Sequence, residues 1–259
     1  MLRQEMTSRK VNDIVGSHLN PIPGHIYGFA DLHGLLPEKF DSYPYGISII
    51  RKLDDEIVDG IKDAPTLAYF NHYVEINQQL QTLSSNIAAD LNKAGTRAVA
   101  IGPTISLSSG EFDAYLPTLR YEISHKMVAT RAGLGWIGKT DLFISEKFGA
   151  RLRLSSILID TEIGPEHTPV NQSRCGKCSL CVEKCPARAA TGQLWDIGTD
   201  RDIFFDAFKC REKCNEFGRI HLRIDRRICG ICVAVCPVGR SVRPRFPFDS
   251  PSQASNNRS

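Results

Sequence analysis

The first 174 residues of this 259-residue chain contain no cysteine, and no stretch approaches the ~18 uninterrupted apolar residues of a membrane helix. The N-terminus also lacks an apolar run followed by a small-residue cleavage site. We therefore expect no signal peptide, no membrane contact and a cytoplasmic location, where disulfides are disfavoured. A net charge of +3 is too small to indicate nucleic-acid binding by itself.

All nine cysteines lie between Cys175 and Cys236, which indicates metal ligation. This shift in composition predicts a domain boundary within "GPEHTPV" at 164–170. We expect an α/β domain over 1–165, a ferredoxin-like double-cluster domain over 166–242 and a disordered polar tail over 243–259.

The clearest predicted helix covers residues 64–94 and ends before Gly95, a residue typical of helix C-termini. Short apolar runs at 46–50 and 97–101 predict buried strands, with this helix packed across them in a mixed α/β layer structure. Runs at 141–145 and 151–160 predict a hairpin. The apolar stripe of the helix, at steps of three and four, comprises Tyr69, Tyr73, Ile76, Leu80, Leu83, Ile87 and Leu91.

The string "GLGWIGKT", from Gly133 to Thr140, matches both the phosphate-binding loop and the dinucleotide fingerprint. Both motifs require a strand before the glycines and a helix after them. Here the preceding residues are helix-like and "DLFIS" that follows is strand-like. This order argues against nucleotide binding and leaves two interpretations: a backbone platform for a ligand, or a tight turn packed under Trp136.

The first cysteine run, "CGKCSLCVEKCP", has the C-x2-C-x2-C-x3-C-P spacing of a bacterial [4Fe–4S] ferredoxin. Three thiolates of such a loop reach three corners of one cluster, and the fourth cysteine ligates the other cluster. Zinc is the alternative, but zinc sites usually separate two C-x2-C pairs by roughly a dozen residues or more.

The second run, "CGICVAVCP", is one cysteine short of a full motif. Crossed ligation assigns Cys175, Cys178, Cys181 and Cys236 to cluster one. It assigns Cys185, Cys229 and Cys232 to cluster two. Either Cys210 or Cys214, one helical turn apart, supplies the eighth ligand, and the other is a spare thiol.

The chain resembles the epoxyqueuosine reductase family over roughly residues 25–242. The resemblance is carried by "AGLGWIGK", then "LFI" and "FGARLRLSSILID", and then the two cysteine runs. The resemblance implies a nitroreductase-like corrinoid-binding domain, related to that of reductive dehalogenases, and two clusters that feed electrons to cobalt. Cobalamin is then the implied cofactor, and Cys210 the implied eighth ligand. The implied corrinoid-binding residues are Gly133, Gly135, Trp136, Gly138 and Lys139.

The chain departs from that family in two places. Full-length members carry a helical extension that binds tRNA after the ferredoxin part. At the corresponding place this sequence has the short polar stretch 243–259. The family's acidic residue, roughly a dozen positions before "AGLG", has no counterpart in "LPTLRYEISHK". The candidate proton donors are therefore Tyr121, Glu122 and His125, with a surface or packing role as the alternative for each.

Two functions compete. The first is a corrinoid-dependent reductase acting on a small substrate or a modified nucleoside, with a ferredoxin- or flavodoxin-type electron donor. The second is an electron-transfer or docking protein without a corrinoid. Seven arginines between Arg219 and Arg245, against the single acid Asp225, suit tRNA phosphates, an acidic donor, or simple compensation of cluster charge.

Overall fold

The computed structural model describes residues 2–104, 110–164 and 167–240. A four-stranded antiparallel sheet with the order β1-β2-β6-β3 forms its centre, and a separate two-stranded sheet pairs β4 with β5. The strands are β1 (His25–Asp31), β2 (Tyr45–Lys52), β3 (Ala98–Ile101), β4 (Gly135–Ile137), β5 (Phe143–Ser145) and β6 (Leu152–Ile159). The helices are α1 (Leu2–Leu19), η1 (Glu38–Phe40), α2 (Asp55–Asp59), α3 (Leu67–Lys93), α4 (Gly110–Tyr115), α5 (His125–Arg131), α6 (Leu180–Glu183), α7 (Arg201–Phe204), α8 (Ala207–Phe217), η2 (Gly218–Leu222) and α9 (Ile231–Val235).

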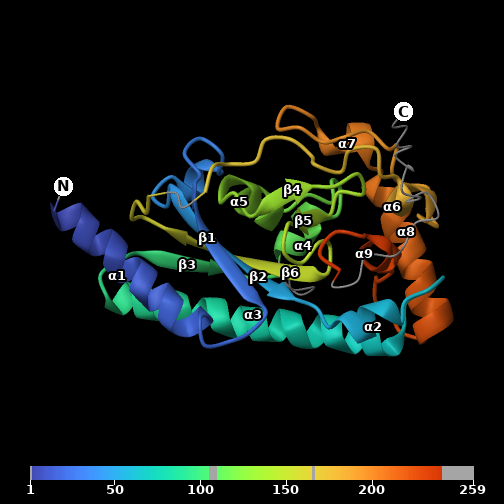
Figure 1. The fold of residues 1–259 in the computed structure, drawn as a ribbon, viewed down its shortest axis with the longest axis horizontal. Helices are drawn as coiled ribbons and strands as arrows, with labels where there is room; N and C mark the ends of the chain where they lie inside the picture. The colour runs from blue at the N-terminus through green and yellow to red at the C-terminus, as the bar shows by residue number, and fades with distance from the viewer. Residues whose placement is uncertain (1, 105–109, 165–166, 241–259) are drawn as a thin grey trace, which may run out of the picture.

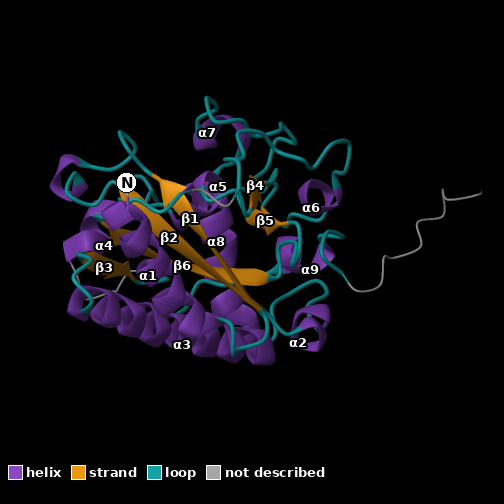
Figure 2. Cartoon of the chain, turned by 60° about the vertical axis from the view of Figure 1, so that its left-hand side comes forward, coloured by secondary structure: helices purple, strands orange, loops and turns teal. Residues whose placement is uncertain are grey.

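Helix α3 lies along one face of the central sheet and α5 covers the other, as Figures 1 and 2 show. Consecutive residues of β2 and of the later part of β6 are buried. Because alternate residues of a strand point to opposite sides, these strands are covered on both faces. Ile47 and Ile49 of β2 pack in the core cluster that contains α3, whereas Ile50 packs with Ala129 of α5. This explains why β2 and β6 read as continuous apolar runs.

The predicted long helix and the strands at 46–50 and 97–101 are confirmed as α3, β2 and β3. Thr66 caps α3 by accepting a hydrogen bond from the backbone amide of Tyr69 at 3.1 Å. Gly95, with φ +94°, follows the last helical turn in the left-handed conformation expected of a helix-ending glycine.

The predicted hairpin between 141–145 and 151–160 is wrong. Strand β5 pairs with β4, while β6 lies in the central sheet between β2 and β3. The glycine string therefore belongs to a small β4–β5 hairpin. Its order is helix α5, turn, strand β4, which is the reverse of a phosphate-binding loop.

Helix α1 and strand β1 were not predicted. Strand β1 forms one edge of the central sheet, and the buried Val11, Val15 and Leu19 pack α1 into the main core. The predicted boundary at 164–170 lies partly outside the described residues, and the predicted tail over 243–259 lies wholly outside them.

Candidate metal centre

The first group of thiols combines the two cysteine runs. The pKa of Cys181 is raised to about 11, chiefly by burial and in smaller part by the nearby Cys175, Cys236 and Cys178. Burial likewise raises the pKa of Cys236, with Cys175 and Cys178 contributing. Cys236 thus lies with the three cysteines of the first run, although it comes from the second.

The second group lies between α8 and α9. Burial raises the pKa of Cys232, and Cys229, Cys210, Cys181 and Cys185 add to this increase. The Cys214 thiol, on the same helix as Cys210, hydrogen-bonds to both Cys210 and Cys229. Both cysteines of α8 therefore border this group, and the choice of the eighth ligand stays a prediction.

The donor set fits two iron–sulfur clusters better than single ions. All nine cysteines are free thiols, and they divide into groups of four and five. Within the described residues, no three His, Cys, Asp or Glu side chains are placed to hold one metal ion. Four thiolates around a [4Fe–4S] cubane bind different irons, so they need not converge on one point.

The glycines of the string at 133–140 pack against protein. A Cβ atom at Gly135 would lie 2.0 Å from the carbonyl oxygen of Ile144, and one at Gly138 would lie 3.0 Å from the Ile144 side chain. Gly133, with φ +72°, has His167 at 2.5 Å from the same position. These contacts favour the packed turn over an open platform for a corrin ring.

Trp136 and Lys139 point toward the first thiol group. The Trp136 indole nitrogen donates a hydrogen bond to Cys175 Sγ at 3.3 Å. The Lys139 ammonium donates to the carbonyl oxygen of Cys178 at 2.9 Å. Neither residue lines the large cavity that Cys210 and Cys214 border. The geometry therefore does not support their predicted contacts with a corrinoid.

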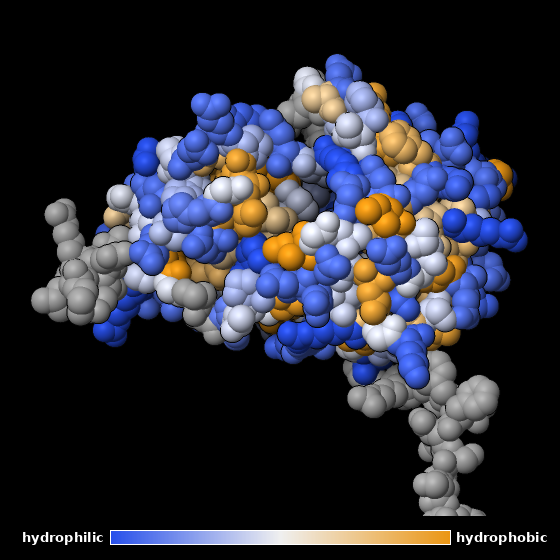
Figure 3. Space-filling model, turned by 90° about the horizontal axis from the view of Figure 1, so that it is seen from above, coloured by the Kyte–Doolittle hydropathy of each residue, from blue (hydrophilic) through white to orange (hydrophobic). Residues whose placement is uncertain are grey.

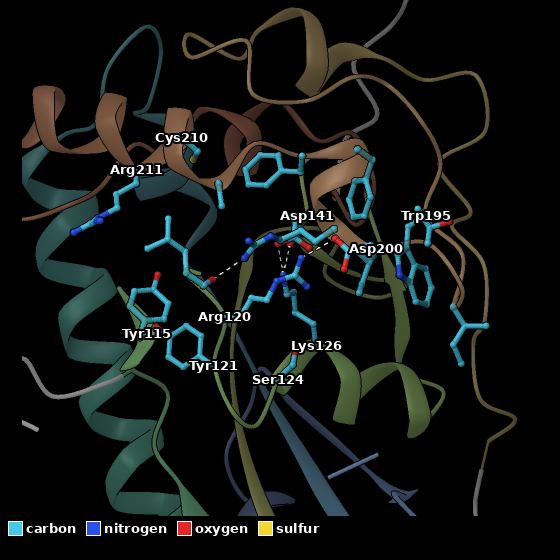
Figure 4. Close-up of a pocket in the computed structure, with 18 of the residues that line it drawn as sticks. Tyr115, Arg120, Tyr121, Ser124, Lys126, Asp141, Trp195, Asp200, Cys210 and Arg211 are labelled. Atoms are coloured by element: carbon cyan, nitrogen blue, oxygen red, sulfur yellow. Dashed lines mark hydrogen bonds and ion pairs between the residues drawn. The ribbon is translucent and has the colours of Figure 1, made fainter. Parts of the chain in front are cut away.

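A cavity of about 750 Å³, the cluster-side cavity, lies between the α/β part and the cysteine-bearing segments (Figure 4). Cys210 and Cys214 form part of its wall, opposite residues of the α5 region. Aromatic side chains line it together with several cations. Its size is typical of a small-molecule or cofactor site. Its lining includes Tyr115, Arg120, Tyr121, Lys126, Ile137, Asp141, Trp195, Gly198, Asp200, Cys210, Arg211, Cys214 and Arg227.

Three ion pairs hold this wall together. Lys126 Nζ lies 2.5 Å from the Asp141 carboxylate. Arg120 lies 2.7 Å from Asp200 and 2.9 Å from Asp202, so it joins the segment before α5 to helix α7 (Figure 4). Because the partners are 80 and 82 residues apart in sequence, spacing alone could not have revealed them.

Of the three candidate proton donors, the structure places only Tyr121 on the cluster-side cavity. Tyr121 and Tyr115 also line two neighbouring cavities of about 630 and 570 Å³. Partial burial raises the pKa of the Tyr121 hydroxyl, and a phenol with its ordinary pKa of about 10 is already protonated at neutral pH.

Glu122 and His125 are engaged elsewhere. Glu122 forms a 2.6 Å ion pair with Lys39. Both ring nitrogens of His125 are used, one with Ser156 Oγ at 2.9 Å and one with the carbonyl oxygen of Gly102 at 2.8 Å. Burial lowers the pKa of His125 to about 4. A packing role therefore suits His125 better than a role as proton donor.

Residues 174–239 match a family model described as a 4Fe-4S double cluster binding domain. The chain also matches epoxyqueuosine reductases. It is 29% identical to the one from Pseudomonas aeruginosa over 193 residues, 70% of this chain and 46% of the relative. It is 26% identical to the one from Cellulophaga algicola, over 74% of this chain and 56% of the relative.

Solved structures share the fold. A catabolic reductive dehalogenase gives a TM-score of 0.60 at 15% identity, covering 83% of this chain and 30% of the other. A selenomethionine-labelled epoxyqueuosine reductase gives 0.58 at 16% identity, covering 90% and 66%. A related dehalogenase structure, at 0.60 and 16% identity over 83% of this chain and 30% of the other, is described as informing B12-dependent dehalogenation.

The two thiol groups and the matched model define an iron–sulfur protein of the double [4Fe–4S] cluster class. More specifically, the full-length relatives that the chain resembles are epoxyqueuosine reductases, at 29% and 26% identity. It spans about half the length of the curated relatives just described. No described helix is both long and apolar enough to cross a membrane.

Proposed function

We propose that this protein is an iron–sulfur reductase that passes electrons through two [4Fe–4S] clusters to a corrinoid, which reduces a small substrate or a modified nucleoside. The observation that carries the proposal is the cluster-side cavity. Cys210 and Cys214 of the second thiol group line it directly, so a group bound there would lie beside the second cluster. A simple electron carrier needs no such cavity.

The cavity walls suit a large, flat, polar-edged cofactor. Tyr115, Tyr121 and Trp195 offer aromatic surfaces, and Arg120, Arg211 and Arg227 offer donors for amide or phosphate oxygens. A bound corrinoid would supply a cobalt centre able to accept electrons and to reduce the substrate. The protein supplies the binding surface and the proton.

Tyr121 is the proton donor in this proposal. Tyr121 lines three adjoining cavities. Its phenol has an ordinary pKa of about 10, which partial burial raises further, so it carries a proton at neutral pH. The Lys126–Asp141 ion pair lines the same cavity. This arrangement substitutes for the acidic residue expected from the resemblance.

Electrons would enter at the first cluster. Cys178 is the one exposed cysteine of the nine. Exposed Lys177, Lys184 and Arg188 lie close to it in sequence, and no ion pair is found for them within the described part of the chain. The face seen from above in Figure 3, toward which α6 and α7 lie in Figure 1, carries hydrophilic residues over much of its area and hydrophobic patches around a central hollow. These features favour an acidic donor of the ferredoxin or flavodoxin type.

A second function, electron transfer without a corrinoid, is favoured by one observation. The glycines expected to face the corrin ring pack instead against Ile144 and His167. Cobalamin binding separates the two functions.

The test is a visible-spectrum titration of the anaerobically reconstituted protein with cobalamin, alongside iron analysis. Gly198→Trp adds a bulky side chain to the cavity lining, at a position where a Cβ atom would contact only Asp196 Oδ1, at 3.4 Å. Gly164→Trp is the matched control, since that position is open and lies off the cavity. We expect binding by the parent and the control, and binding about tenfold weaker or more, about 1.4 kcal/mol, by Gly198→Trp. If the parent protein binds no cobalamin while it contains all of its iron, the corrinoid proposal is wrong and the electron-transfer function is favoured.

A further inference from the structure

The segment Trp136–Thr140, here called the hairpin loop, runs beside the first run of cysteines. Trp136 Nε1 donates to Cys175 Sγ at 3.3 Å, and Lys139 Nζ donates to the Cys178 carbonyl oxygen at 2.9 Å. The Thr140 side chain hydrogen-bonds to Cys181. Three side chains of one loop thus each contact a different proposed ligand of the first cluster.

Lys139 is an unusual residue for this place. The residue is only 7% exposed, and within the described residues no carboxylate forms an ion pair with its ammonium group. A buried ammonium without an anionic partner is costly, because charge is poorly solvated in a protein interior. A cluster held by four thiolates beside the Cys178 backbone would supply the missing negative charge.

The backbone of the hairpin loop is built for close approach. The Gly138 amide donates to the Leu142 carbonyl oxygen at 2.8 Å, and the Asp141 amide donates back to the Gly138 carbonyl oxygen at 2.9 Å, which closes the turn. A Cβ atom at Gly138 would lie 3.6 Å from Cys175 Sγ. Glycine therefore lets the loop lie against the sulfur without a side chain between them.

We infer that the hairpin loop is an electrostatic cradle that raises the reduction potential of the first cluster. Hydrogen bonds to ligand sulfurs and a nearby positive charge stabilise the extra electron of the reduced cluster more than the oxidised state. This inference rests on the cluster ligands and does not depend on a corrinoid. It also accounts for the string that resembles a phosphate-binding loop, since its lysine is directed at cluster one.

The test is an EPR-monitored redox titration of both clusters in the reconstituted full chain. Trp136→Phe, Lys139→Met and Thr140→Val should each shift the midpoint potential of one cluster to more negative values and leave the other unchanged. The matched control is Lys147→Met, which removes an exposed lysine near the same hairpin. This control should leave the affected cluster at the parent potential.

Unchanged potentials in Lys139→Met and Thr140→Val, with parent iron content, would overturn the inference and reduce the hairpin loop to packing. Equal shifts of both clusters would also overturn it. Thr140→Val keeps the shape of the side chain and removes only the hydroxyl group. If Trp136→Phe loses iron, the potential of Thr140→Val decides the test. Cobalamin binding is measured separately, so failure of the corrinoid proposal would leave this result interpretable.

Discussion

Arg151 donates a hydrogen bond from Nη2 to the carbonyl oxygen of Ala234 at 3.2 Å, across 83 positions of sequence. The same guanidinium pairs with Asp55 at 3.1 Å and Asp59 at 2.5 Å, and its side chain is 1% exposed. Arg151 thereby joins helix α2 and the start of β6 to helix α9, two residues before the predicted cluster ligand Cys236.

Arg151→Met should lower the free energy of unfolding by roughly 1.5–3 kcal/mol, the value for hydrogen bonds to charged groups. The two aspartates left behind are partly accessible to water, which limits the cost. Urea unfolding of the reconstituted protein measures the change. Arg153→Met is the control for iron content, because Arg153 lies two residues further along and hydrogen-bonds to Asn77 of α3 instead. We expect less iron in Arg151→Met and the parent amount in Arg153→Met. Full loading in Arg151→Met would contradict this role.

His125 predicts a pH dependence of stability. Its folded pKa of about 4 lies below the ordinary value of 6.5, so the unfolded chain binds a proton first as the pH falls. The stability supplied by the neutral ring is therefore present above pH 6.5 and is lost between that value and about 4. Between pH 7 and 5 the loss is about 2 kcal/mol. His125→Gln should flatten this part of the profile in urea unfolding, and an unchanged slope would contradict the assignment.

The eighth cluster ligand is predicted to be Cys210. Cys210→Ser should remove one cluster, about four of eight irons, and Cys214→Ser should leave both. The reason is the position of the isolated ligand in the resembling family. Iron analysis with EPR after anaerobic reconstitution measures both variants. The opposite pattern would move the ligand to Cys214, which the structure places in the same thiol group.

The string at 133–140 should not bind nucleotide. It joins α5 to β4, so no helix N-terminus follows it to receive a phosphate, and Lys139 is buried against Cys178. Isothermal titration of the parent and Lys139→Ala with ATP should detect no heat of binding in either. Micromolar binding by the parent that Lys139→Ala abolishes would overturn the topological argument.

The regular elements could be predicted where one physical signal dominates. The stripe from Tyr69 to Leu91 predicted α3 because its buried face repeats every three to four residues. Helix α1 carries the same signal more sparsely, in Val11, Val15 and Leu19, four residues apart, and could have been found from it. The pairing of β5 with β4 could not, because local sequence does not specify a strand's partner.

The site divides in the same way. Cysteine spacing predicted the two thiol groups because cluster geometry constrains neighbours in sequence. The contacts of Trp136 and Lys139 with Cys175 and Cys178 each span 39 positions, and only tertiary packing creates them. The sequence therefore indicated that the glycine string has a special role, while the fold indicates which partner it contacts.

The central claim is that the cysteines hold two [4Fe–4S] clusters, one of them beside the cluster-side cavity. The most direct test is to quantify iron, acid-labile sulfide and zinc per chain in anaerobically prepared protein, with the EPR spectrum of the reduced state. The account predicts about eight irons and about eight sulfides per chain, with two reducible clusters. Stoichiometric zinc with little iron and no sulfide would contradict it.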